Sequence, residues 1–445
     1  MSHSIQPASI LFPRGFWGQG VFCDVKRLGT GKGSNKGKKR DLAILFSPSP
    51  CVAAGMFTTN QVSAAPVHVC IEHLKGRSLH GIVVNSGNAN ACTGEQGFRD
   101  AKRMCQEVGK VLSIDEKKIL VASTGRIGLP LPMPQVRRGI RAACSTLAQT
   151  REAGDHVSEA ILTSDTHMKQ YSAEIMMGGK PVRIGAAAKG AGMIHPGMSP
   201  DGKRPMSMPL HATMLGFILT DANISKSSLQ RCLTQAVALS FNRISIDGDM
   251  STNDSVIALA NGEAGNKKLH HGSKSIASQT EIGQFQEALN EVCLELAKML
   301  VRDGEGVSRF VTVRLEGARS SKDADLALRS VCNSALVKTS WLGGDPNWGR
   351  ILDALGYSEA KVDPSKVNVG YRLRANSPVV YSLKNGKPTR VGFAKLCSLV
   401  AGPEIELHIH LNLGKGRGVM YASDLTEAYV SFNKGDVTDP ASLGG

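Results

Sequence analysis

One threonine in the chain lies where a hydroxyl nucleophile could be generated. Thr213 follows a polar stretch rich in glycine, proline and serine, and it precedes an apolar run, 214–219, that is typical of a buried strand. Cleavage between Ala212 and Thr213 would give Thr213 a free α-amine beside its hydroxyl, which is one recognised way to activate a threonine. On this stretch alone, the simpler interpretation is that Thr213 begins a core strand.

A second group of residues could stabilise negative charge. The apolar run 119–123 predicts a strand, and it leads directly into Thr124 and Gly125. A strand that stops in such a turn leaves backbone N–H groups and a hydroxyl unpaired, and these are the donors that an oxyanion hole needs. The stretch 85–94 is also dense in small polar residues, and it fits either a backbone-lined pocket or an elaborate turn.

The elements that must position these residues can be predicted from periodicity. Helical spacing is seen at 98–108, 136–147, 229–237 with Asn223 as N-cap, and 285–299, and strict alternation at 404–411 predicts a strand. The run 41–46 predicts a strand that ends in a turn at Pro48 and Pro50. Mixed strands and helices in 445 residues favour an α/β protein of two or three domains.

The net charge of +15 is concentrated near the N-terminus. Seven basic residues and no acid lie between Lys26 and Arg40. Because this segment is rich in glycine and lacks aromatic residues, it fits a solvated hairpin loop better than a nucleic-acid arm, although both interpretations remain open. Its glycines do not match the phosphate-binding GxxxxGK[ST] pattern.

The composition of the chain also indicates the cellular compartment in which the protein is expected. No run of 18 apolar residues occurs, so we expect no membrane contact. Ten scattered cysteines without CxxC spacing, and a leader that resembles no targeting peptide, predict reduced thiols and a cytoplasmic protein.

Two sites for metal ions can be considered and are not favoured. His408 and His410 share one face of a predicted strand, but no third ligand is apparent. The acids of the loop 247–254 superficially resemble an EF-hand, but that loop lacks the final glutamate ligand. We therefore predict no metal.

Ten motifs in one order give the chain a resemblance to a known family. These are FTTNQVSAAPV at 57–67, NSGNANACTG at 85–94, STGRIG at 123–128, LTSDTHMK at 162–169, KGAGMI at 189–194, HATMLGFILTDA at 211–222, DGDMSTNDS at 247–255, RDGEG at 302–306, GGDPNWGR at 343–350 and FNKGDVT at 432–438. Together they resemble the ornithine acetyltransferase family of arginine biosynthesis, which includes bifunctional glutamate N-acetyltransferases. The resemblance spans about residues 15–438.

The resemblance implies a fold and a self-processing step. It implies a layered α-β-β-α sandwich of the self-cleaving threonine-nucleophile type, with a second, smaller α/β domain. Cleavage between Ala212 and Thr213 would give an α-chain of residues 1–212 and a β-chain of residues 213–445.

The resemblance also implies roles for single residues. Thr213 would be the nucleophile, with Thr124 and Gly125 as the oxyanion hole. The implied substrate contacts are Thr163, Lys189, Thr213, Glu305, Asn433 and Thr438. Among these, Glu305 could pair with the side-chain ammonium of ornithine, because opposite charges form strong hydrogen bonds.

The implied reaction is a ping-pong acetyl transfer from N-acetylornithine to glutamate, which gives ornithine and N-acetylglutamate. No metal or redox cofactor is implied, and acetyl-CoA remains open as a second acetyl donor. The implied assembly is a heterotetramer of two α-chains and two β-chains.

The sequence departs from the family between Lys189 and Thr213. These residues are 24 positions apart, with extra polar residues around 197–207. Because the entropic cost of closing a loop rises slowly with its length, we still expect cleavage. Two alternatives remain open: an amidase or aminopeptidase that passes its acyl group to water, and a non-enzymatic nucleic-acid-binding protein that uses the segment 26–40.

Overall fold

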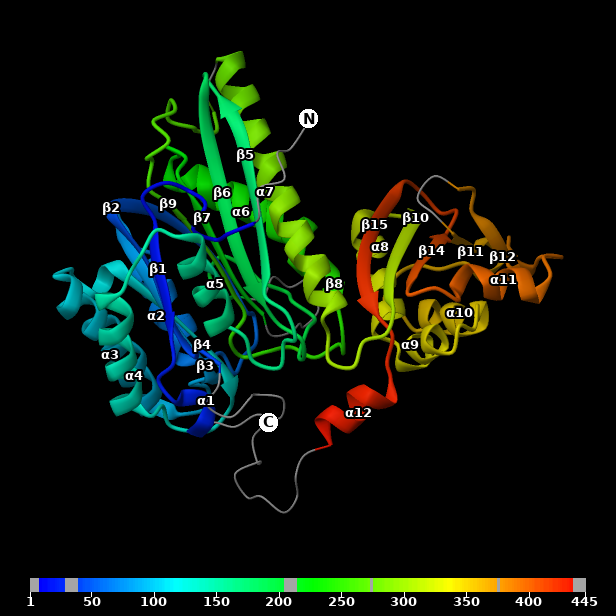
Figure 1. Cartoon of the computed structure of the whole chain (residues 1–445). Coiled ribbons are helices and arrows are strands. Elements are labelled where there is room, and N and C mark those ends of the chain that lie inside the picture. The colour runs from blue at the N-terminus through cyan, green and yellow to red at the C-terminus, as the bar shows by residue number, and fades with distance from the viewer. Residues whose placement is uncertain (1–7, 29–38, 204–213, 273–274, 374–376, 435–445) are drawn as a thin grey trace. The chain divides into compact units, whose positions relative to one another are not determined.

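The computed structural model describes residues 8–28, 39–203, 214–272, 275–373 and 377–434 (Figure 1). The chain forms two compact units. Unit 1 contains residues 1–242, 249–300 and 435–445, and unit 2 contains residues 243–248 and 301–434. The expected cleavage point at 212–213 therefore does not separate the units, because residues that follow it belong to both.

Unit 1 is built on an eight-stranded sheet of its described residues. Its order is β4 (Ile119–Arg126), β3 (Leu79–Asn88), β2 (Leu42–Phe57), β9 (Ser255–Ala260), β7 (Leu215–Thr220), β6 (Lys180–Lys189) and β5 (Lys169–Met177), with β1 (Trp17–Val21) beside β2. The pairs β3–β4 and β7–β9 are parallel, and the other pairs are antiparallel. Strands from before and after residue 212 thus share one sheet.

Strand β2 joins the two halves of this sheet and corrects one prediction. We expected the strand to end in a turn at Pro48 and Pro50, but β2 continues to Phe57. Its first part pairs with β3 and its second part with β9, and the register with β3 shifts between Phe46 and Cys51. Proline is tolerated in a strand at such an irregularity because no ladder N–H is required there. The predicted turn is therefore an irregular passage from one half of the sheet to the other.

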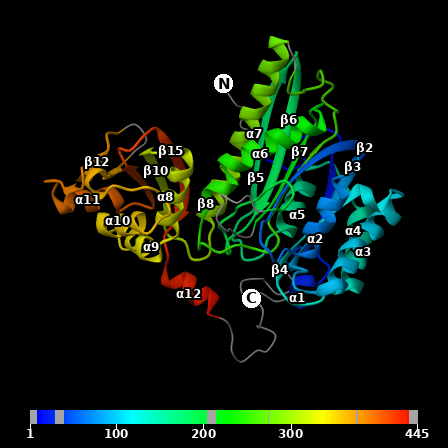
Figure 2. The same ribbon diagram turned by 180° about the vertical axis from the view of Figure 1, so that it is seen from behind.

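Helices cover the two sides of unit 1. Helices α2 (Ala65–His73), α3 (Gly94–Leu112) and α4 (Met133–Ser145) lie on one side, and α6 (Lys226–Leu239) and α7 (Ile276–Arg302) lie on the other (Figures 1 and 2). Helix α5 (Arg151–Ala160) packs on β1, and the short α1 (Val25–Leu28) packs near β3. One core joins Val83 and Leu120 of the first half-sheet to Phe217 and Ile257 of the second. This layering confirms the predicted α-β-β-α sandwich.

The N-cap predicted for α6 is wrong by two residues. Ser225, not Asn223, accepts a hydrogen bond from the N–H of Ser228 and begins the helix. Asn223 instead exchanges hydrogen bonds with Asn266. Both side chains can cap a helix, so their types alone do not distinguish the positions.

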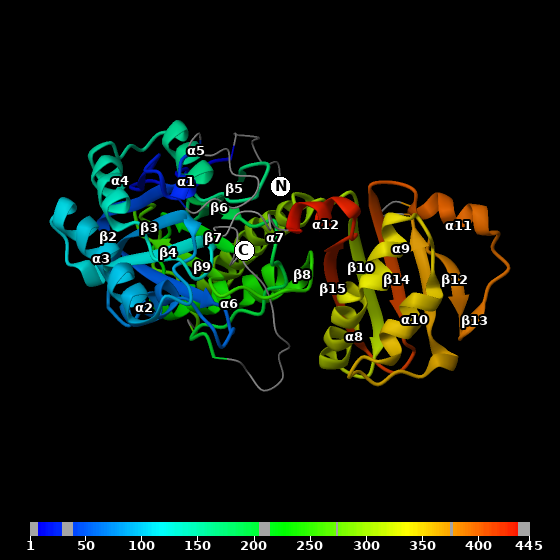
Figure 3. The same cartoon turned by 90° about the horizontal axis from the view of Figure 1, so that it is seen from below.

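Unit 2 is a smaller α/β unit with one sheet and one helical layer. The strand order is β13 (Lys387–Pro388), β12 (Val380–Lys384), β11 (Asn368–Arg372), β14 (Glu404–His410), β10 (Phe310–Ala318), β15 (Gly416–Ser423) and β8 (Ile244–Ser245). Helices α8 (Ser321–Asn333), α9 (Ala335–Leu342) and α10 (Trp348–Gly356) lie over one face (Figure 3). Helices α11 (Phe393–Val400) and α12 (Glu427–Asn433) and the 3-10 turns 116–118, 241–243 and 364–366 complete the elements of the described chain.

The alternation predicted for β14 is confirmed. Ile405, Leu407 and Ile409 enter the core of unit 2. On the other face, His408 Nε2 lies 3.0 Å from Glu406 Oε1, a carboxylate that Arg314 also binds. His408 therefore lies beside the ion pair of Glu406 and Arg314, and its pKa is lowered mainly by burial.

Three further expectations concern the cysteines, membrane-spanning helices and the basic segment near the N-terminus. All ten cysteines are free thiols, as their spacing predicted. Within the described ranges, no helix is long and apolar enough to cross a membrane. Most of the basic segment, residues 29–38, lies outside those ranges.

Candidate active site

Sheet pairing in unit 1 brings the ends of several strands together. Lys189, the last residue of β6, pairs with Leu215 at the start of β7, and Leu215 pairs with Ser255 at the start of β9. On β4, Thr124 pairs with Ser86 of β3. These strand ends position Thr124, Gly125 and Lys189, whereas Thr163 lies in the connection between α5 and β5.

Lys189 connects two of the predicted threonines. Its Nζ donates to Thr163 Oγ1 at 2.7 Å and to Thr124 Oγ1 at 3.4 Å, and the lysine is 3% exposed. Because the ammonium is the donor in both contacts, the hydroxyl hydrogen of Thr124 remains available to another acceptor. An acyl oxygen that develops negative charge would be such an acceptor.

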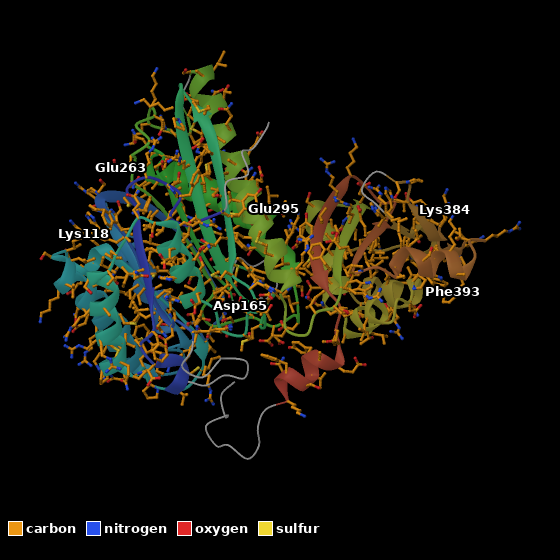
Figure 4. The ribbon with its side chains drawn as sticks, viewed as in Figure 1. Lys118, Asp165, Glu263, Glu295, Lys384 and Phe393 are labelled. Atoms are coloured by element: carbon orange, nitrogen blue, oxygen red, sulfur yellow. The ribbon has the colours of Figure 1, made fainter. Side chains whose placement is uncertain are left out.

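A buried carboxylate fixes the position of this lysine. Asp165 lies 3.7 Å from Lys189 Nζ and 2.8 Å from Lys169 Nζ, and it also accepts the N–H groups of Gly190 and Thr163 at 2.6 and 3.0 Å. Figure 4 shows Asp165 near the ends of β5 and β6. Both carboxylate oxygens of Asp165 thus contact a backbone N–H group and a lysine of the site.

The resulting cluster carries formal excess positive charge. Asp165, Lys169 and Lys189 are all almost fully buried, and they comprise two cations and one anion. Burial alone would raise the pKa of Asp165, but the charges of Lys169 and Lys189 outweigh it and hold that pKa well below its usual range. Buried positive charge is weakly screened by water, so the cluster favours an anion or a developing oxyanion beside Thr124.

Gly125 has a backbone conformation that a side chain would not tolerate. Its φ is +130°, and a Cβ built there would lie 2.3 Å from the carbonyl carbon of Gly87. Only glycine allows β3 and β4 to approach so closely at this point. The predicted turn after residue 123 is wrong, because β4 continues to Arg126 and both Thr124 and Gly125 pair with β3. Glycine is required at this position by the close approach of the two strands.

The proposed cleavage residues Ala212 and Thr213 lie outside the described residues, and so does the predicted substrate contact Thr438. The described chain resumes at Met214, directly before β7, and Met214 is fully buried. Its N–H donates to the carboxyl of Asp254, and its carbonyl accepts the N–H of Ser255 at 3.0 Å. The backbone after Thr213 is thus held on both sides by the start of β9.

The two predicted contacts described in unit 2 lie together. Asn433 Nδ2 donates to Glu305 Oε2 at 2.9 Å, and it also donates to the carbonyl of Tyr429 within α12. Asn433 is exposed and Glu305 is half-buried. A carboxylate held by an uncharged amide keeps its negative charge available for an ammonium group.

The loop that carries Glu305 is fastened to the start of α12. Thr426 Oγ1 donates to the carbonyl of Gly306 at 2.6 Å and accepts the N–H of Tyr429 as the N-cap of α12. Asp424 accepts the N–H groups of Ser308 and Arg309 at 3.0 and 3.1 Å. The position of Glu305 therefore depends on the position of α12.

Sequence reasoning missed four buried residues of unit 1: Asp165, Lys169, Asn253 and Asp254. All four lie inside the quoted motifs LTSDTHMK and DGDMSTNDS. The available signal was the presence of charged and amide residues directly before apolar strands, where burial was expected. Their partners, however, are up to 164 residues distant along the chain, as between Asn253 and Ala89.

Comparison with known proteins identifies the family. The sequence profile of the ArgJ family matches residues 27–436, which is most of the chain. This chain belongs to the ArgJ family. The membership confirms the family and the acyltransferase class that the motifs predicted.

Individual relatives agree over nearly their whole length. The chain is 42% identical to the arginine biosynthesis bifunctional protein ArgJ of Symbiobacterium thermophilum, over 95% of this chain and 96% of the relative. It is 43% identical to the protein of that name from Syntrophotalea carbinolica, over 90% and 95%. A solved structure of ornithine acetyltransferase from Mycobacterium tuberculosis in complex with ornithine is 32% identical, with a TM-score of 0.38, and the match covers 44% of this chain and 98% of that one.

Proposed function

We propose that this chain transfers the acetyl group of N-acetylornithine to glutamate through an acetyl-enzyme on Thr213, after cleavage between Ala212 and Thr213. The observation that carries the proposal is the buried contact of Lys189 with Thr124 and Thr163, directly beside the strand that follows Thr213. Membership of the ArgJ family supports the choice of substrates.

The first half-reaction begins with attack of Thr213 Oγ on the acetyl carbonyl. The hydroxyl proton passes to the α-amine of Thr213, whose usual pKa of about 7.7–8 suits a base at neutral pH. Thr124 and Gly125 stabilise the oxyanion of the tetrahedral intermediate, with the charge of Lys189 close to Thr124. When the carbon–nitrogen bond breaks, the departing amine of ornithine takes that proton, and an acetyl ester remains on Thr213.

The second half-reaction reverses these roles. The α-amine of glutamate attacks the ester carbonyl, and its proton passes through the α-amine of Thr213 to the departing Oγ. N-acetylglutamate is released and the threonine is regenerated. This chemistry requires no metal or redox cofactor.

Charge complementarity supports the assignment of substrates. The side-chain ammonium of ornithine fits the Glu305 carboxylate, which Asn433 orients. The carboxylates of both amino acids fit the buried excess positive charge of Lys169 and Lys189. We propose that Thr438 also contacts the substrate, and that the assembly contains two copies of each cleaved chain.

A coupled assay tests this function against hydrolysis. We expect release of ornithine from N-acetylornithine to depend on glutamate and to yield equal amounts of N-acetylglutamate. Release of acetate at the same rate without glutamate would contradict transfer and would favour the amidase alternative. A parallel reaction with acetyl-CoA and glutamate shows whether acetyl-CoA is also a donor.

A second assay tests the nucleic-acid alternative. Deletion of the basic residues 29–38 should leave acetyl transfer unchanged. Salt-sensitive binding of the full chain to DNA or RNA, lost in the deletion variant, would instead support a nucleic-acid arm.

A further inference from the structure

Asp254 is a buried acid that the proposed reaction does not yet use. It is fully buried at the start of β9, directly after Asn253. One carboxyl oxygen, Oδ1, accepts the N–H of Met214. Within the described part of the chain, the other oxygen, Oδ2, has no hydrogen-bond partner. A fully buried acid in such a position requires an explanation, because its desolvation is costly.

Burial disfavours the charged form of this acid. Burial raises the pKa of Asp254 well above its usual range, and this effect exceeds the opposing influences of the Met214 N–H and the Lys189 charge. The side chain accepts the N–H of Met214, and a carboxyl oxygen can accept a hydrogen bond in either protonation state.

Asn253, the residue before Asp254, forms hydrogen bonds that hold strand β4. Asn253 Nδ2 donates to the carbonyl of Ser123 at 2.7 Å and to the carbonyl of Ala89 at 2.6 Å. Ser123 directly precedes Thr124. Two neighbouring residues directly before β9 therefore bind two different elements: Asn253 binds β4, and Asp254 binds the residue before β7.

The turn that carries both residues is itself fixed. Thr58 donates its N–H to the carbonyl of Asp254 at 2.9 Å and its Oγ1 to the carbonyl of Ser251 at 2.7 Å. Ala64 donates to the carbonyl of Thr252 at 2.8 Å. The segment 251–254 is therefore a rigid support to which the oxyanion strand and the strand after Thr213 are both attached.

We propose that Asp254 is a positioning residue that holds the N–H of Met214 and thereby sets the nucleophile relative to the oxyanion donors on β4. The α-nitrogen of Thr213 is only three covalent bonds from the nitrogen of Met214, so a hydrogen bond at Met214 restricts it directly. This inference rests on the proposed role of Thr213. It extends that role by assigning a second residue on which both self-cleavage and acetyl transfer depend.

Two substitutions of Asp254 separate positioning from other roles. Asp254→Asn keeps an acceptor oxygen at nearly the same place, whereas Asp254→Ala removes it. We expect Asp254→Asn to cleave and to transfer acetyl with a kcat within about threefold of the wild type. We expect Asp254→Ala to lower the rates of cleavage and transfer by on the order of 10²-fold, because small misplacements of reacting groups have effects of that size.

The measurements are intact mass for cleavage, steady-state kinetics for transfer and thermal unfolding for stability. The KM of the Ala variant for N-acetylornithine should stay near that of the wild type, which a general loss of structure would not give. If Asp254→Ala does not fold, Asp254→Ser is the milder truncation, and the same fall in kcat is expected of it.

Three results would overturn the inference. They are full cleavage and activity in the truncated variants, a rise in KM with unchanged kcat, and a loss in Asp254→Asn as large as in Asp254→Ala, which would show that the acid proton itself is needed. The wild type is assayed in parallel. A wild type that transfers no acetyl group contradicts the proposed function, whereas an active wild type with fully active variants contradicts only the role of Asp254.

Discussion

At the scale of residues, the described part of the site is a set of hydroxyls and charges arranged around Lys189. Thr124 and Thr163 both accept from its ammonium, and Asp165 balances part of its charge. Such preorganised groups act in a site that excludes water, where they lose no energy to reorientation during the reaction. The proposed chemistry would therefore depend on single hydrogen bonds that can be removed one at a time.

The hydroxyl of Thr124 gives the first prediction. Thr124→Ala should lower kcat by about 10²–10³-fold, as the loss of one oxyanion donor typically does. Thr124→Ser is the matched control because it keeps the hydroxyl, and it should retain most of the activity. Steady-state kinetics with N-acetylornithine and glutamate measure both variants. An Ala variant as active as the Ser variant would show that the Thr124 hydroxyl is not an oxyanion donor.

The charge of Asp165 gives a prediction about stability and pH. Its folded pKa is depressed by Lys169 and Lys189, so it stabilises the fold above its unfolded pKa of about 3.9 and loses this contribution as the pH falls below that value. Asp165→Asn should lower the free energy of unfolding at pH 7 by about 3–5 kcal/mol, because buried lysines lose their counter-charge.

Denaturant titrations at pH 7 and in steps from about pH 5 to about pH 2, roughly the range over which such a carboxylate loses its contribution, measure this effect. The difference between wild type and Asp165→Asn should shrink as the pH falls. The exposed Asp353 provides a matched control, Asp353→Asn, which should differ little from the wild type at any pH. A pH-independent difference for Asp165→Asn would contradict the ion-pair explanation.

At the scale of elements, the site depends on how strand ends and helix starts are joined. In unit 1, β2 passes between two half-sheets, and the 251–254 turn holds β4 and β7. In unit 2, the N-cap of α12 holds the loop of Glu305. A hydrogen bond at an element boundary can therefore change substrate binding without contacting the substrate.

The N-cap of α12 gives the prediction at this scale. Thr426→Ala removes the hydroxyl that bonds Gly306 and caps the helix, so Glu305 and Asn433 should lose their mutual alignment. We expect the KM for N-acetylornithine to rise and stability to fall by about 1 kcal/mol, a typical effect of losing a cap. Thr426→Ser should behave as the wild type. An unchanged KM in the Ala variant would show that Glu305 is positioned independently of α12.

Local structure was largely predictable from the sequence, and long-range structure was not. The helices around Met104 and Val292 and the strand at 404–411 follow apolar periodicity, which depends only on near neighbours. The passage of β2 through Pro48 and Pro50 was predicted as a turn, because the partner strand β9 lies about 200 residues later in the chain.

The site residues divide in the same way, into those that motifs predict and those that only long-range contacts reveal. Thr124, Gly125, Thr163, Lys189, Glu305 and Asn433 could be named from motifs, and the structure brings the first four together in unit 1 and the last two together in unit 2. Asp165 and Asp254 were passed over as loop acids. Their importance follows from burial and from partners such as Met214, which only the folded chain brings to them.

At the scale of the whole molecule, cleavage would divide the chain within unit 1 and not between its compact units. Strand β6 precedes residue 212 and β7 follows it, and they pair along six residues of each strand. Strands β2 and β9 likewise come from opposite sides of the cleavage point. The fragments of 212 and 233 residues would therefore share one sheet and one core.

This arrangement predicts that the fragments remain associated after cleavage. Two masses should appear under denaturing conditions, whereas native mass spectrometry should show one assembly that contains both. Unfolding should release both fragments in one transition, because their strands belong to the same sheet. Fragments that separate without denaturant would contradict a shared core.

The most direct test of the central claim is the mass of the acetyl-enzyme. The protein is mixed with N-acetylornithine in the absence of glutamate, quenched with acid, and its fragments are weighed and sequenced. The proposal predicts that the fragment beginning at Thr213 gains one acetyl group on that threonine, and that addition of glutamate before the quench removes it. An uncleaved chain, or acetylation at any other residue with full transfer activity in Thr213→Ala, would contradict the claim that Thr213 is the nucleophile.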